Sequence, residues 1–150
     1  MTHWRMQLHP SKPEAAIEYC VKSLTTGYIG LDFTVDIGDL TTASRNDVPE
    51  NQRDYLAFAD EMKPGDHVLI IVHHFPFALV TVDGPYNFIR KPIPELGVWF
   101  QHLRKVRNVR YYADFITNAH AWERIIMTDT ISPLRDQNSK SYQLIENWKV

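Results

Sequence analysis

Residues 62–82 read MKPGDHVLIIVHHFPFALVTV and carry the clearest secondary-structure signal in the chain. Lys63-Pro64-Gly65-Asp66 has the composition of a tight turn. Two apolar runs follow, over 67–73 and 77–82, separated by a short connection that contains Pro76. Short apolar runs bounded by turn residues indicate buried strands. We therefore predict two consecutive strands here.

Weaker signals flank this stretch on both sides. Four further segments have strand-like patterns: 4–8, 28–33, 86–89 and 98–114, the last with Asn108 at a bend. Four segments have helical spacing: 11–24, 51–62, 117–127 and 139–148. Turn or loop composition separates these elements at 34–49, 83–85 and 91–96. Gly30, inside a strand pattern, indicates a bulge or a close backbone approach. Several short strands with helices mostly at the ends predict an α+β fold, with a small, partly closed barrel.

Length and composition favour one ordinary globular domain over 1–150. The chain has 150 residues, 44% of them hydrophobic and 23% charged, which are typical globular values. No apolar run approaches the roughly 20 residues of a membrane helix, and the N-terminus lacks the pattern of a secretion signal. Cys20 is the only cysteine, which excludes an intrachain disulfide and a multi-cysteine zinc site. We expect a cytoplasmic protein without a membrane partner.

Charge is distributed unevenly although the net charge is only −2. Residues 1–62 contain ten acids and five bases, whereas residues 90–110 contain six bases and a single acid, Glu95. A local basic patch can bind phosphates whatever the total charge. The basic segment therefore indicates a nucleic-acid contact, with a solvated strand face as the alternative.

Catalytic motifs are absent from the sequence. It contains no phosphate-binding glycine loop, no G-x-S-x-G and no H-E-x-x-H. His73 and His74 are adjacent on a predicted strand and point to opposite sides, and His102 and His120 are isolated. We therefore expect no metal, no cofactor and no catalytic residue. An enzyme acting on a nucleotide-like substrate, with Asp32, His73 or His74 as acid or base, is an alternative.

Aromatic residues make up 12% of the chain, and several follow strand ends or turns. They are Phe33, Tyr86, Phe88, Trp99 and Phe100. Strand ends and loops are where pockets form, and a flat base is held by stacking on aromatic rings. Aromatics beside a basic segment thus favour binding of one extruded or single-stranded base. Ordinary core packing is the alternative.

Five short segments, in order and spacing, resemble the EVE-type domains of the PUA-like superfamily, whose relatives include YTH, SRA and ASCH domains. They are GYIGLDF (27–33), IGDL (37–40), MKPGDHVLI (62–70), VTVDGPY (80–86) and LRKVR (103–107). The resemblance covers roughly residues 4–115 and is closest to the N-terminal reader domains of modification-dependent restriction enzymes. It implies a six-stranded, barrel-like sheet with flanking helices. Residues 118–150 lie beyond it, and either pack on the barrel or lead to an effector domain.

The resemblance also implies a function and a site. It implies a non-catalytic module that flips a modified DNA base, typically methylcytosine or methyladenine, into an aromatic cage. The implied base-binding residues are Phe33 (a tryptophan in the family), Tyr86, Phe88 and Trp99 as cage walls, with Asp32 and Asn87 reading the base edge. The implied phosphate-binding residues are Arg90, Lys91, Arg104, Lys105, Arg107 and Arg110. A fused or separate nuclease or NTPase effector is the implied partner. RNA binding and a plain protein-interaction domain are alternatives.

Overall fold

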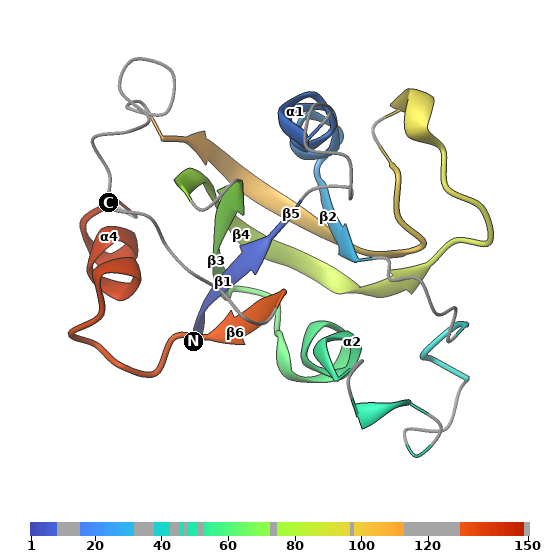
Figure 1. The fold of residues 1–150 in the computed structure, drawn as a ribbon, viewed down its shortest axis with the longest axis horizontal. Coiled ribbons are helices and arrows are strands. Elements are labelled where there is room, and N and C mark those ends of the chain that lie inside the picture. The colour runs from blue at the N-terminus through green and yellow to red at the C-terminus, as the bar shows by residue number, and fades with distance from the viewer. Residues whose placement is uncertain are drawn as a thin grey trace.

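The computed structural model describes residues 1–8, 16–31, 38–42, 46, 48–50, 53–72, 75–96, 98–112 and 130–148. These residues form a mixed α+β fold around one six-stranded sheet that curls into a half-barrel (Figure 1). The strand order is β2-β5-β4-β3-β1-β6. The predicted α+β class and the partly closed, barrel-like curl of the sheet are thus confirmed.

The strands pair mostly with antiparallel neighbours. Their bounds are β1 His3–Gln7, β2 Tyr28–Leu31, β3 His67–Val72, β4 Phe75–Phe88, β5 His102–Tyr111 and β6 Ile131–Pro133. Only β1 and β3 run parallel, among the strands that the structure describes. The first strand of the chain therefore lies inside the sheet, between β3 and β6.

The turn predicted at 83–85 is wrong, because β4 continues through it to Phe88. Val82 pairs with Val106 and Tyr86 pairs with Arg104, so the register shifts between the two pairs. The extra residues of β4 form a bulge, which tolerates glycine and proline because its backbone leaves the regular ladder. The strands predicted at 77–82 and 86–89 are consequently one strand.

Helical segments flank the sheet. They are α1 (Ala16–Thr26), α2 (Asp54–Leu56) continuing as a π-helical turn (η4, Ala57–Glu61), a 3₁₀ turn (η5, Pro94–Leu96) and α4 (Lys140–Trp148). The helices predicted at 51–62 and 139–148 are confirmed, although the first is short and irregular. The predicted start of α1 at 11 and the helix at 117–127 lie outside the described residues. None of the described helices has the length and apolar character needed to span a bilayer.

Both faces of the sheet bury apolar side chains. Side chains of a strand alternate between its faces. On β3, Val68 and Ile70 pack into the main core, while Leu69 and Ile71 pack on the outer face with Ile145 of α4. The sheet is therefore covered on both sides at its centre, which explains why this strand has an unbroken apolar sequence.

Asp66 explains the turn at the start of β3. Its side chain is only 4% exposed, and its carboxylate accepts hydrogen bonds from the backbone N–H of Thr2 and Lys63, each at 2.9 Å. It also accepts the indole N–H of Trp4 at 2.9 Å. Hydrogen bonds to an ionised acceptor are the strong ones in proteins. Asp66 thereby fixes β1 to the turn.

Gly30 makes the close backbone approach that its place in a strand predicts. The ring of Phe100 lies where a β-carbon at this position would be, so a larger residue would collide with it. Phe100 is fully buried. The segment before β5 can therefore pack directly on β2.

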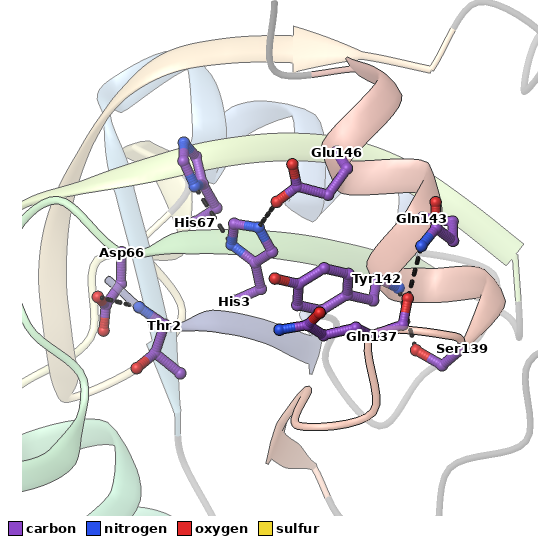
Figure 2. Close-up of polar contacts among 9 residues, drawn as sticks. All are labelled: Thr2, His3, Asp66, His67, Gln137, Ser139, Tyr142, Gln143 and Glu146. Atoms are coloured by element: carbon purple, nitrogen blue, oxygen red, sulfur yellow. Dashed lines mark hydrogen bonds and ion pairs between the residues drawn. The ribbon is translucent and has the colours of Figure 1, made fainter.

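Polar contacts attach α4 to the outer face of the sheet. In Figure 2 the ring of His3 lies between Glu146 of α4 and His67 of β3. His3 Nε2 is 2.6 Å from Glu146 Oε1, and its Nδ1 is 3.3 Å from His67 Nδ1. Arg5 donates to Ser141 Oγ at 3.2 Å. These contacts fix the position of α4 against β1 and β3.

Candidate nucleic-acid interface

Three strands meet at the end of the sheet where the predicted base site lies. Leu31, the last residue of β2, and Phe88, the last residue of β4, both pair with His102, the first residue of β5. Two predicted site residues, Asp32 and Phe33, directly follow Leu31 but lie outside the described residues. The described part of the site therefore consists of residues from β4, β5 and their connection.

Tyr86 is partly exposed and held by hydrogen bonds. Its hydroxyl lies 2.6 Å from His102 Nδ1 and accepts the backbone N–H of Leu40 at 3.2 Å. Its ring meets that of Phe58 edge-on, with centroids 6.4 Å apart. The ring is thus fixed in place before any ligand binds, which reduces the entropy lost on binding.

His102 is a site residue that the sequence does not reveal. It is fully buried, and its ring centroid lies 4.4 Å from that of Tyr55 and 5.1 Å from that of Phe88. Cross-strand partners share a face, so His102, Tyr86 and Phe88 lie on the same face of the sheet. An isolated histidine gives no sequence signal for this arrangement.

The connection between β4 and β5 extends the same end of the sheet as a hairpin. Ile89 donates to the carbonyl of Gln101 at 2.8 Å, and Ile93 and Val98 form an antiparallel bridge. The hairpin carries Trp99, which is partly exposed and meets Phe100 edge-on at 5.1 Å. The indole nitrogen of Trp99 is buried without a hydrogen-bond partner among the described residues. Such a donor is uncommon, and water or a ligand atom can satisfy it.

Asn87 does not face the same way as its neighbours. It pairs with Leu103, so its side chain lies on the opposite face from Tyr86 and Phe88. It is exposed, and its amide donates to the carbonyl of Pro85 at 3.3 Å. The structure therefore does not bring Asn87 together with these two rings.

Arg104 is a buried structural residue and not a phosphate ligand. It is 2% exposed, and its guanidinium donates to the carbonyls of Gly84 (3.1 and 2.8 Å), Phe58 (3.0 Å) and Met62. Burial lowers the pKa of Arg104, and the charge of Asp66 acts in the opposite direction. Because its donors already bind the backbone, the prediction that Arg104 contacts phosphate is wrong.

The other predicted cations are exposed but divide into two groups. Arg90 and Lys91 follow Phe88 on the hairpin, next to the aromatic end of the sheet. Lys105 and Arg107 alternate with the buried Arg104 and Val106, so they lie on the opposite face from Tyr86. Arg107 forms an ion pair with Asp83 at 3.0 Å. The cations bordering the described aromatic site are therefore those of the hairpin.

Three pockets in the described part of the chain lie away from these aromatics. One of about 450 Å³ is bounded by the N-terminus, the segment after β6 and Tyr142. One of about 60 Å³ lies beside Asn108 and Arg110, and one of about 280 Å³ lies between the end of β5 and α4. Among the described residues, no group of three or more His, Cys, Asp and Glu side chains is placed to hold a metal ion.

The thiol of Cys20 is buried, so its reactivity toward a thiol reagent tests how α1 packs on the sheet. The thiol donates to the carbonyl of Leu8, and burial raises its pKa from 9.0 to about 12. We expect no reaction with a disulfide reagent at pH 8 in the folded protein and full reaction in urea, measured by absorbance. Because the folded pKa is raised, the stability from the neutral thiol is present below pH 9 and is lost between pH 9 and 12. Rapid reaction of the folded protein would contradict this packing.

No protein-family model matches this chain, and no curated protein matches its sequence.

Proposed function

We propose that this chain is a non-catalytic nucleic-acid-binding module that holds one base against Tyr86, Phe88 and Trp99. The observation that carries the proposal is the group of partly exposed rings at one end of the sheet, with Arg90 and Lys91 on the adjoining hairpin. Rings supply a stacking surface for a planar base, and arginine and lysine supply charge for the flanking phosphates.

Preorganisation supports this assignment. The Tyr86 hydroxyl is fixed by His102 and Leu40, and Phe88 packs on the fully buried ring of His102. A base would therefore meet side chains that already have their bound positions. The curled six-stranded sheet with flanking helices also fits an EVE-type, PUA-like fold, for which base recognition is the implied function.

We propose that the preferred ligand is a methylated base in DNA. We also propose that the module supplies this recognition to a nuclease or NTPase effector. Extrusion of a base from the duplex costs a few kcal/mol, and stacking of that base on an aromatic side chain offsets about 1–3 kcal/mol of this cost. Burial of one methyl group adds about 0.8 kcal/mol. The methyl group thus contributes a several-fold preference, while stacking and phosphate contacts supply most of the affinity.

Loss of the rings should remove base recognition. We expect Phe88→Ala and Trp99→Ala each to weaken binding of a methylated duplex by about 1–3 kcal/mol. Fluorescence anisotropy with labelled oligonucleotides carrying methylcytosine, hydroxymethylcytosine, methyladenine or no modification measures this, with RNA of the same sequence as competitor.

Matched controls separate the site from the rest of the surface. Tyr19→Ala removes a partly exposed ring on α1, and Lys140→Gln removes an exposed charge on α4; both should bind like the parent. Arg90→Gln should weaken all sequences equally and reduce the salt dependence. Unchanged binding by both ring variants would refute the site, and stronger competition by RNA would identify an RNA-binding module instead.

A further inference from the structure

A bulge in β5 turns two arginines toward the same face. Arg107 pairs with Thr81 and Arg110 pairs with Leu79, so β5 advances by one more residue than β4 between the two pairs. Asn108 lies between them with a φ of 53°, in the left-handed region. In a regular strand, residues three apart face opposite sides. The extra residue therefore brings Arg110 to the face that Arg107 occupies.

The resulting cationic row consists of Lys105, Arg107 and Arg110, all exposed. It lies on the outer face of the sheet, where Leu79 packs with the residues of α4. Asp83 forms an ion pair with Arg107 at 3.0 Å. The row thus presents a net positive strip along one strand.

An aromatic pocket adjoins the end of the cationic row. It has a volume of about 280 Å³ and is lined by Tyr111, Tyr112, Leu144, Asn147 and Trp148. The guanidinium of Arg110 donates to the carbonyl of Trp148 at 2.7 Å, which places the last cation at the pocket rim.

The pocket has the size and surface for one planar ring. Tyr112 and Trp148 meet edge-on with centroids 5.4 Å apart, and Tyr111 is 43% exposed. The volume of about 280 Å³ is just below the range of about 300–1,000 Å³ for sites that hold a whole drug-sized ligand, as expected for a single ring. The side-chain amide of Asn147 can both donate and accept hydrogen bonds at a base edge.

We propose that this pocket binds a base of a single-stranded nucleic acid whose phosphates follow Lys105, Arg107 and Arg110. The inference rests on the proposed nucleic-acid function but concerns a second site, which the cationic row on the outer face of β5 and the pocket at the end of that strand form together, away from Tyr86 and Phe88. The positive charge of the cationic row favours a polyanion as the ligand. The aromatic pocket beside the row favours a nucleic-acid strand whose bases are accessible for stacking. Paired bases in a duplex do not expose their rings, so the ligand is single-stranded.

The test uses a fluorescein-labelled, unmodified oligothymidine in anisotropy titrations at several salt concentrations. We expect Tyr112→Ala, which removes the ring that meets Trp148, to weaken binding about 5- to 150-fold, the range for loss of one stacked base. Lys105→Gln combined with Arg107→Gln should reduce the slope of log affinity against log salt by about 1.4. Lys105 and Arg107 are exposed and Tyr112 is partly exposed, and urea denaturation verifies that each variant is folded. Lys140→Gln is the matched control and should bind like the parent.

A crosslinking experiment locates the base directly. A bromouracil-substituted strand, irradiated with the full chain, should crosslink to Tyr111, Tyr112 or Trp148. Tyr19→Ala, outside both sites, should leave oligothymidine binding unchanged. Loss of oligothymidine binding with the preference for a methylated over an unmodified duplex retained would identify failure of the second site alone, and the reverse result would identify failure of the first. Absence of oligothymidine binding at low salt, parental affinity of the Tyr112 and double-cation variants, or crosslinks only elsewhere would each overturn the second site.

Discussion

Replacing Arg104 with methionine is expected to destabilise the folded chain by about 3–5 kcal/mol, the cost of breaking a buried charged network. Methionine fills a similar space but leaves the carbonyls of Gly84, Phe58 and Met62 without their donors. It also removes the positive charge near the buried Asp66. A small domain has a total unfolding free energy of only about 5–15 kcal/mol, so this substitution removes a large share of it. Urea denaturation followed by tryptophan fluorescence measures the change.

The neighbouring lysine is the matched control for this substitution. Lys105 is exposed on the same strand, and Lys105→Met should change the unfolding free energy by no more than about 0.5 kcal/mol. Arg104→Lys should resemble Arg104→Met more than the parent, because one ammonium cannot reproduce the planar fork of donors. Equal stability of the Arg104 and Lys105 variants would show that the arginine is not a structural cross-link.

A valine at position 30 is expected to destabilise the fold by about 3 kcal/mol, the upper part of the range for overpacking. The ring of Phe100 occupies the space of a β-carbon at Gly30, and both residues are buried, so neither can move into solvent. Thermal unfolding followed by circular dichroism, with urea denaturation for the free energy, measures the effect.

A double-mutant cycle identifies the collision as the cause. Combining Gly30→Val with Phe100→Leu should cost less than the sum of the two single changes, because the smaller side chain makes room. Gly84→Ala is the matched glycine control: its β-carbon would lie 3.4 Å from Lys105 Cβ, near ordinary contact. Strict additivity of the two core changes would exclude a direct clash.

Alternation and turn composition are sufficient to predict most of the sheet, because both are local properties of the sequence. They fail at 83–85, since Asp83-Gly84-Pro85 fits a bulge as well as a turn and only pairing with β5 distinguishes the two. The close approach at Gly30 is predicted correctly, because a glycine inside a strand usually marks either a bulge or a neighbouring segment that leaves no room for a side chain.

The site is harder to predict because its geometry depends on contacts distant in sequence. Arg104 has the same local charge pattern as Lys105, and its burial follows from carbonyls that η4 brings to it. His102 gives no signal until the pairing places it between β2 and β4. The bulge at Asn108 changes which face Arg110 occupies, and a count of alternating residues cannot anticipate that change.

The position of β1 inside the sheet determines the order in which the protein can fold during synthesis. The amide of Thr2 and the indole of Trp4 bind Asp66, more than 60 residues later, and β1 also pairs with β6 at Ile131–Pro133. During synthesis, β1 therefore leaves the ribosome before either of its partner strands, β3 and β6. Its backbone N–H and C=O groups stay unpaired until those strands follow. At about 5–20 residues per second, synthesis of β6 follows that of β1 by several seconds or longer, and β1 remains without its full set of partners for that time.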